Sequence, residues 1–347
     1  MPLYLGLRVG SQFLDAVLIE AGGRQRRILF QGAAACNGEQ SLSDAIDHTL
    51  GAIAVHAEFD VDDLRAISGA GDPADIASSA ALLTDTATDE PVLSEHWQGR
   101  FSLPPARIVE WVDDRSARAL GIGVIRPGML GISLDLADAI FTSGPESRGA
   151  TFRNGALARD WMRLDYGLDG NAFVRLLEAK PGNDGYLMLP WVEAEDTPRV
   201  ERPGVRRFGF DRTDAGTNVR GLVEGQMMAM ANHAANIDGG GIDRIIAIGP
   251  GAADHALLQV MANVFGADVH RMDVTNAEAL GAALHAFHAE RIADDEALSW
   301  ATVVSGFTDR NPAYRVSPNP RLVAMYRSLR REYAILERLH KDRGPIC

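Results

Sequence analysis

Two glycine-containing turns have residue types that suit the binding of a phosphate group. In the first turn, Gly10, Ser11 and Gln12 follow an apolar run at residues 3–9. Glycine lets the backbone approach a ligand closely, so the amides of this turn could point at phosphate oxygens. A single glycine turn is also an ordinary way to close a hairpin, and the residues alone favour that second interpretation.

The second turn consists of Gly249, Pro250 and Gly251, between an apolar run at 242–248 and an amphipathic stretch at 256–265. Its glycines would let a planar base or a ribose approach the backbone, and a helix N-terminus favours phosphate. Proline stiffens the turn and removes one amide donor. A plain strand-to-helix connection is the alternative, and both interpretations stay open.

Asp114 stands directly before a short helical stretch at 115–120. A carboxylate in this position could act as a general base or could simply cap the helix. Arg115 could pair with Asp114 and lower its basicity. Asp72, at the end of a Gly-x-Gly-Asp pattern at 69–72, is a second candidate, and it ranks lower because it follows the fourth predicted strand.

The elements that would position the first turn are read from apolar periodicity. Strands are predicted at 3–9, 14–19 and 27–30, then a helix at 41–57 and a strand at 64–67. Three strands, a helix and a strand are typical of the opening of a ribonuclease-H-like, or actin-like, domain. Residues 72–105 show no sustained period, and a strand at 107–112 precedes the helix at 115–120.

A second, similar arrangement of elements follows in the other half of the chain. Strands are predicted at 129–134, 139–141, 242–248 and 268–271, and helices at 154–161, 171–179, 217–237, 256–265 and 277–289. Two similar α/β halves indicate a duplicated fold with a cleft between the halves.

Composition excludes several classes of protein. The 347 residues are 46% hydrophobic and 23% charged, with a net charge of -13, which argues against a nucleic-acid partner. Cys36 and Cys347 make no disulfide framework, so a reducing cytoplasm is expected. We expect no signal peptide and no membrane span. No metal site is predicted, because the scattered histidines lack ligand spacing with Cys or Asp.

Several segments, in order, resemble the FGGY carbohydrate kinases, and most of all their xylulokinase branch. Leu189-Pro190-Trp191 and the residues to 198 resemble the family's Leu-Pro-Tyr segment, and 208–225 resembles its second signature. The turn at 248–251 and the helix to 266 resemble the adenosine motif. Further similar segments lie at 121–128, 276–283 and 318–335.

This resemblance implies an α/β, actin-like (ribonuclease-H-like) ATPase fold made of two duplicated domains. It implies a shortened sugar-side domain at 1–120, a nucleotide-side domain at 121–295 and a helical extension at 296–347. The expected ligands are a sugar and ATP with Mg²⁺, and a homodimer is a further expectation. Asp114 would be the catalytic base, and the turns at 10–12 and 249–251 would contact the nucleotide.

Two residues depart from the family's pattern on the phosphate side. Arg8 stands where the family has the Asp that organises Mg²⁺, and an arginine cannot ligate a cation. Asp135, with Leu136 and Ala137, replaces a Gly-Thr-Ser phosphate loop and brings a carboxylate near the expected phosphate. The family is also far longer between Ala66 and Arg107, where much of its sugar-binding wall lies.

Three functions are therefore open. The first is an ATP-dependent, xylulokinase-like sugar kinase that transfers the γ-phosphate to a sugar hydroxyl. The second is a catalytically inactive homologue that binds nucleotide or sugar as a regulatory or scaffold protein, which Arg8 and Asp135 favour. The third is a subunit that needs another chain to complete its sugar site.

Overall fold

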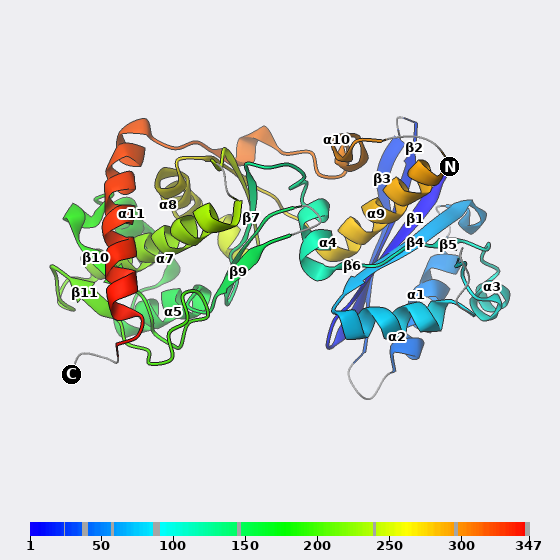
Figure 1. Cartoon of the computed structure of the whole chain (residues 1–347), viewed down its shortest axis with the longest axis horizontal. Helices are drawn as coiled ribbons and strands as arrows, with labels where there is room; N and C mark the ends of the chain where they lie inside the picture. Colours follow the sequence, from blue (N-terminus) through cyan, green and yellow to red (C-terminus); the bar gives the residue numbers. More distant parts are fainter. Residues whose placement is uncertain are drawn as a thin grey trace. The chain divides into compact units, whose positions relative to one another are not determined.

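The computed structural model describes residues 1–23, 25–36, 41–56, 59–85, 91–143, 147–238, 241–294 and 298–343. The chain divides into two compact units (Figure 1). Unit 1 comprises Met1–Ile125 and Val274–Asp309, and unit 2 comprises Arg126–Asp273 and Arg310–Cys347. The chain therefore passes between the units three times.

This division differs from the predicted ranges 1–120, 121–295 and 296–347. Helix α9 (Ala277–Ala293) belongs to unit 1, because its small residues pack directly on strand β1 (Leu3–Val9). A Cβ atom at Gly6 of β1 would overlap the backbone of α9 at Ala279 and Ala283. The residues after 309 return to unit 2 and do not form a separate extension.

Unit 1 is built on one mixed sheet. Strands β1, β2 (Phe13–Gly22) and β3 (Gln25–Ala35) are antiparallel, and β4 (Leu64–Gly71) pairs parallel with β1. The short strands β5 (Arg107–Ile108) and β6 (Val112–Asp113) continue the sheet beside β4, giving the order β3-β2-β1-β4-β5. The predicted opening of three strands, a helix and a strand is confirmed.

The helices of unit 1 include two in the segment for which the sequence predicted no regular structure. Within residues 72–105, α2 (Pro73–Leu83) and α3 (Glu95–Phe101) form, and residues 86–90 lie outside the described part. Proline at the first position favours the start of α2. The other helices are α1 (Leu42–Ala54), α4 (Asp114–Gly121), α9, α10 (Trp300–Val304) and the 3₁₀ turn η1 (Val61–Asp63).

Helices α4 and α9 touch through their backbones. A Cβ atom at Gly281 would overlap the carbonyl oxygen of Ala117, and one at Gly121 would overlap the carbonyl oxygen of Ala277. Only glycine permits this approach at both crossing points. The contact places Gly121, at the end of α4, against Ala277 at the start of α9, and places Ala117, in the first turn of α4, against Gly281.

Unit 2 repeats the strand order of unit 1. Its sheet runs β14-β13-β12-β7-β8-β9, in which β7, β8 and β9 are antiparallel and β12 and β13 are parallel to β7. Read from β9 to β13, this is the order of β3 to β5, so the predicted duplication is confirmed. The strands are β7 (Met129–Ser133), β8 (Asp138–Phe141), β9 (Gly149–Phe152), β12 (Arg244–Ile248), β13 (Asp268–Arg271) and β14 (Arg315–Val316).

The helices of unit 2 enclose a core around α7 (Ala215–Asp238), where Met227, Met228 and Met230 are buried. A separate two-stranded ribbon joins β10 (Leu187–Leu189) to β11 (Arg206–Phe208). The remaining elements are α5 (Ala156–Asp165), α6 (Gly170–Glu178), α8 (His255–Phe265), α11 (Pro320–His340) and the 3₁₀ turns η2 (Asn183–Gly185), η3 (Pro250–Ala253) and η4 (Pro312–Tyr314). Among the described helices, none is both long and apolar enough to cross a bilayer.

Candidate functional site

In unit 1, Arg8 lies between two carboxylates. Arg8 on β1 faces Asp15 on β2 in the strand register, and its Nη1 lies 3.6 Å from Asp15 Oδ2. Its Nη2 donates to Asp114 Oδ2 across 3.3 Å, from the other side. The side chains of Arg8 and Asp114 are 30% and 28% exposed, so the pair is partly shielded from water.

Asp114 does not cap helix α4, because Asp113 does. The Asp113 carboxylate accepts hydrogen bonds from the backbone amides of Arg115 and Ser116, at 3.1 and 3.0 Å. Asp114 is the first residue of the helix, and its carboxylate pairs with Arg8. Its second oxygen, Oδ1, is buried and has no hydrogen-bond partner among the described residues.

Burial and neighbouring charges act in opposite directions on these carboxyl groups. Burial raises the pKa of Asp114 and of Asp15, while Arg8 opposes the increase in both. Burial alone would lower the pKa of Arg8, but the negative charges of Asp114, Glu278 and Asp15 outweigh it and raise that pKa. Arg8 therefore stays charged, and Asp114 is a base whose lone pairs are partly used by an ion pair.

A second ion pair extends the charge cluster across the α4–α9 contact. Arg118 Nε donates to Glu278 Oε1 at 2.6 Å. The cluster of Arg8, Asp15, Asp114, Arg118 and Glu278 thus contains three carboxylates and two guanidinium groups. The two guanidinium groups offset two of the three carboxylate charges.

The first predicted turn, with Gly10, Ser11 and Gln12, joins β1 to β2. The Gly10 amide donates to Phe13 O at 2.9 Å, and Gln12 O accepts from the Cys36 amide at 2.7 Å. A Cβ atom at Gly10 would lie 2.5 Å from Arg8 Nη1, so the guanidinium occupies the space beside this turn. Ser11 and Gln12 are exposed. Their predicted contact with a nucleotide stays a prediction.

The residues at this place do not fit the Mg²⁺ ion that the family resemblance implies. Arg8 offers only hydrogen-bond donors, and its charge repels a cation. Within the described ranges, no group of three or more His, Cys, Asp or Glu side chains is arranged to hold a metal ion.

In unit 2, the second predicted turn is hydrogen-bonded to Leu134, the residue that follows β7. Gly249 has a φ of 87°, and the Gly251 amide donates to Leu134 O at 3.0 Å. The Ala252 amide donates to Gly249 O at 3.0 Å, inside η3. Gly249 and Pro250 are exposed and Gly251 is half-buried. The role of Gly249, Pro250 and Gly251 in binding a nucleotide stays a prediction.

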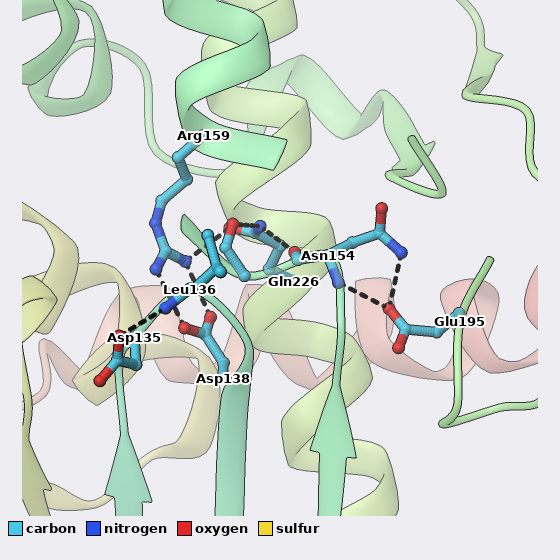
Figure 2. A network of polar contacts seen from close by, with 8 residues as sticks. Asp135, Leu136, Asp138, Asn154, Arg159, Glu195 and Gln226 are labelled. Carbon is cyan, nitrogen blue, oxygen red and sulfur yellow. Dashed lines mark hydrogen bonds and ion pairs between the residues drawn. The ribbon is translucent and has the colours of Figure 1, made fainter. Parts of the chain in front are cut away.

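The neighbouring β7–β8 loop, residues 134–137, is exposed at Asp135 and Leu136, but its backbone carbonyl groups bond to the start of α5 (Figure 2 shows the surroundings of this loop). The Asp135 carboxylate accepts from the Leu136 amide at 2.7 Å. The carbonyl oxygens of Asp135 and Leu136 accept from Ala156 and Leu157, at 2.9 and 3.4 Å. Those two amides are the first of α5, so the loop itself satisfies the start of this helix.

A buried ion pair holds Asp138, the residue that follows the β7–β8 loop. Arg159 of α5 makes two parallel hydrogen bonds to Asp138, at 2.8 and 3.0 Å, and a third to Gln226 at 3.2 Å (Figure 2). Burial raises the pKa of Asp138, and Arg159 opposes that rise. Neither residue was predicted to belong to a site. The signal that could have found the pair is an aspartate directly before the apolar residues 139–141, because a buried aspartate needs a partner.

The Gln226 amide links this pair to the start of α5 and to the segment after β10. Gln226 donates to Asn154 O and Gly155 O, at 2.5 and 2.9 Å. The Asn154 side chain in turn donates to Glu195 at 2.9 Å. Glu195 belongs to the segment that resembles the family's signature, so the network joins that segment to the β7–β8 loop.

A cavity of about 630 Å³ lies within unit 2, beside the start of α8. Its walls come from the end of α6, from one face of α8 and from the segment before and at the start of α11. The described residues that line it are Leu177, Glu178, Pro181, Arg220, His255, Ala256, Gln259, Val260, Asn263, Ser317, Pro318, Asn319, Pro320 and Leu322. The volume is that of a site for a small molecule.

Comparison with known proteins agrees with this architecture. Residues 155–290 match the C-terminal domain of the FGGY family of carbohydrate kinases. The xylulose kinase of Rattus norvegicus is 29% identical over 285 residues, which are 73% of this chain and 52% of that protein. Xylulose kinase 2 of Arabidopsis thaliana is 26% identical over 238 residues, 56% of this chain and 42% of that protein. The chain thus spans about half the length of the curated relatives it matches.

Solved structures establish the fold. Xylulose kinase from Rhodospirillum rubrum superposes with a TM-score of 0.77 at 15% identity, over 97% of this chain and 98% of that one. Glycerol kinase from Plasmodium falciparum, solved with ADP, gives 0.65 at 10% identity over 97% and 98%. The predicted actin-like ATPase fold is confirmed. The sequence and structure matches together show that this chain is similar to the FGGY carbohydrate kinases, and among them to the xylulose kinases.

Proposed function

We propose that this chain is a carbohydrate-kinase homologue that binds small polar ligands and has lost most or all phosphoryl transfer. It would act as a regulatory or scaffold protein. One observation carries the proposal, namely the ion pair between Arg8 and Asp114 at 3.3 Å. The residue that the family resemblance makes the catalytic base is held by a permanent cation.

Phosphoryl transfer needs a base for the attacking hydroxyl and positive charge on the transferred phosphate, usually from a metal. Arg8 engages the Asp114 carboxylate and repels a metal from the same place. Asp135, in the β7–β8 loop, adds negative charge where the resemblance expects a phosphate. These changes lie in different units of the chain, and each lowers the rate of transfer.

A xylulokinase-like kinase that transfers the ATP γ-phosphate to a pentulose hydroxyl is the second candidate. One observation favours it: Asp114 Oδ1 is buried and unpartnered among the described residues, so this oxygen keeps lone pairs that no hydrogen bond uses. Burial also raises the pKa of Asp114, which makes it a stronger base than an ordinary carboxylate. The relatives whose names specify xylulose support the same candidate.

Release of ADP from Mg-ATP in the presence of D-xylulose separates the two candidates. We expect the wild type to release ADP no faster than Asp114→Asn, which lacks the base but keeps the side-chain shape. Wild-type turnover that is abolished by Asp114→Asn would overturn the proposal in favour of the kinase. Circular dichroism would first show that the Arg8→Asp variant is folded. We expect ATP binding by this variant to depend on Mg²⁺.

The remaining expectations concern the setting of the protein. We propose a cytoplasmic protein that forms a homodimer and binds neither nucleic acid nor membrane. The net charge of -13 supports the absence of nucleic-acid binding. Light scattering at micromolar concentration tests the dimer, and a mass equal to one chain would contradict it.

A further inference from the structure

One side of helix α11 carries a row of arginines that faces the solvent. The opposite side packs against α7 and α8 of unit 2 and buries Tyr326 and Tyr333 (Figure 1). Arg327, Arg331 and Arg338 are exposed. Since an α-helix turns by about 100° per residue, these three positions fall within about 40° of one another around its axis. We call the three residues the arginine row.

The positive charges of the arginine row are not balanced inside the protein. Among the described residues, no carboxylate lies within ion-pair distance of these three guanidinium groups, and the groups donate no hydrogen bond. Arg330, on the inward side, donates to Asn232 Oδ1 and Ala231 O, at 3.0 and 2.7 Å. Burial lowers the pKa of Arg330, and the nearby charge of Arg327 lowers it further. Positive charge therefore accumulates along this helix.

Helix stability in the free protein does not account for the arginine row. Like charges four residues apart, as at Arg327 and Arg331, destabilise a helix slightly. Cations are favourable in the last turn of a helix, through its dipole, and only Arg338 of the row lies there. The segment 320–343 contains seven Lys or Arg and three Asp or Glu, whereas the whole chain has 34 and 47. The row is thus a local excess of positive charge in an acidic protein.

Exposed apolar side chains accompany the row. Ile335 lies between Arg331 and Arg338 along the helix and is 48% exposed, and Leu339 is 51% exposed. Arginine beside apolar side chains is common in protein interfaces, where apolar contact contributes affinity and charge selects the partner. This face of α11 offers both kinds of contact to another protein.

The spacing of the arginine row selects the shape of the partner. Its intervals of four and seven residues correspond to about 6 and 10.5 Å along the helix axis. Carboxylates separated by four and seven residues on a second helix reproduce both intervals. An extended strand repeats the same face about every 7 Å, so it matches only the shorter one. We infer that the arginine row docks an acidic helix of a partner protein, whose carboxylates pair with the three arginines and whose apolar side chain covers Ile335.

Other occupants fit this face less well. A second copy of the chain that used the same face around a two-fold axis would bring arginines against arginines. A helix that lies on a membrane buries its apolar side in the lipid, and the apolar side of α11 is buried in the core of unit 2. The inference rests on the proposed regulatory or scaffold role, since it names the surface through which such a protein would hold its partner.

Binding of a designed acidic helix to the whole chain tests the inference. The probe is a fluorescein-labelled helical peptide with four glutamates at intervals of four, seven and four residues, which match the row in either direction, and with leucines midway between the central pair. The control peptide has the same composition, with its glutamates spread around the helix. At about 0.15 M salt, where long-range charge effects are screened, we expect the matched peptide to bind at least tenfold more tightly by fluorescence anisotropy. Equal affinities, or no binding of either peptide, would overturn the inference.

Charge-reversal variants locate the binding surface. Arg327→Glu/Arg331→Glu should weaken binding of the matched peptide at least tenfold, because two ion pairs become repulsive contacts. A peptide with lysine in place of each glutamate should bind this variant and not the wild type. Arg65→Glu/Arg202→Glu makes the same change in net charge at exposed positions outside α11, and it should bind the matched peptide as the wild type does. Equal loss of binding in both double variants would show an effect of net charge alone and would overturn the inference.

Two further measurements separate the other occupants. The wild type should not sediment with vesicles of phosphatidylserine and phosphatidylcholine. Vesicle binding that Arg327→Glu/Arg331→Glu abolishes would assign the row to a membrane and overturn the inference. The variant should keep the wild-type mass in light scattering, and a fall from two chains to one would assign the row to a contact between copies instead. None of these outcomes depends on turnover, so the docking surface and the proposed loss of phosphoryl transfer can fail separately.

Discussion

Arg8 Nη2 lies 3.3 Å from Asp114 Oδ2, and this contact joins strand β1 to helix α4 of unit 1. The two residues are 106 positions apart in the chain. The contact places a fixed positive charge on the carboxylate that the family resemblance assigns to catalysis. The guanidinium thereby offsets the charge of this carboxylate, and its Nη1 lies 3.6 Å from a second carboxylate, that of Asp15.

The Arg8–Asp114 pair should contribute modestly to stability. We expect a double-mutant cycle of Arg8→Met and Asp114→Asn to give a coupling free energy of about 1 kcal/mol, because both side chains are partly exposed. Urea denaturation of the four proteins measures it. The exposed pair of Arg126 and Asp243, with variants of the same types, is the control and should couple by about 0.3 kcal/mol. A coupling free energy of zero between Arg8 and Asp114 would contradict the ion pair.

Local patterns predicted the elements well where burial follows a simple period. Strands at 3–9 and 14–19 and the helix at 217–237 match β1, β2 and α7 closely. The apolar residues of β1 and β2 belong to the buried clusters of unit 1, and those of α7 belong to the core of unit 2. The helices α2 and α3 were missed. They are short and rich in small and polar residues, and their helical state depends on contacts with the rest of unit 1.

The site could be predicted only in part, for a physical reason. Asp114 was found through resemblance, but its partner was expected to be the adjacent Arg115 and is instead Arg8, which only the folded sheet brings near. The unit boundary after residue 273 depends on the close contact between α4 and α9. Glycines such as Gly281 allow this contact, but a single glycine in a sequence does not predict it. Interactions between distant segments carry no local signal in one sequence.

Loss of Arg159 should be far more harmful than loss of an exposed arginine on the same helix. Arg159→Met strands the Asp138 carboxylate, which is 1% exposed, and should lower the free energy of unfolding by about 3–5 kcal/mol. Arg163→Met breaks the exposed pair with Asp160 and should cost about 0.5 kcal/mol. Urea denaturation compares the two. The double variant Asp138→Leu/Arg159→Met should recover part of the loss, and equal losses at 159 and 163 would refute the buried pair.

The α4–α9 contact should not tolerate a single added methyl group. Gly281→Ala would overlap the Ala117 backbone and should destabilise the protein by about 3 kcal/mol, because neither backbone can move independently. Gly99→Ala is the matched control. It lies on α3 with open space around it and should stabilise the protein by about 0.5–1 kcal/mol. Thermal unfolding measures both changes, and a stabilising Gly281→Ala would show that the helices do not approach this closely.

His285 of α9 should make stability depend on pH in the range below 6.5. Its ring contacts Ser68 Oγ at 3.3 Å and stacks near Trp300. Burial lowers the pKa of His285 from 6.5, His288 lowers it further, and Glu110 opposes them. Between that lowered pKa and 6.5, the unfolded chain binds more protons than the folded one. The free energy of unfolding therefore falls as pH falls below 6.5, and this contribution is fully present above 6.5.

The His285→Gln variant should lose that part of the pH dependence. We expect its free energy of unfolding to fall less steeply between pH 6.5 and 5 than that of the wild type, even if its stability at pH 7 is lower. Urea denaturation at half-unit pH intervals gives the two slopes. His48→Gln, at an exposed position on α1, controls for the change of residue type. A group that is protonated less readily in the folded protein than in the unfolded chain must make the free energy of unfolding fall more steeply as the pH is lowered. Identical slopes for the wild type and His285→Gln would therefore mean that the buried imidazole does not resist protonation.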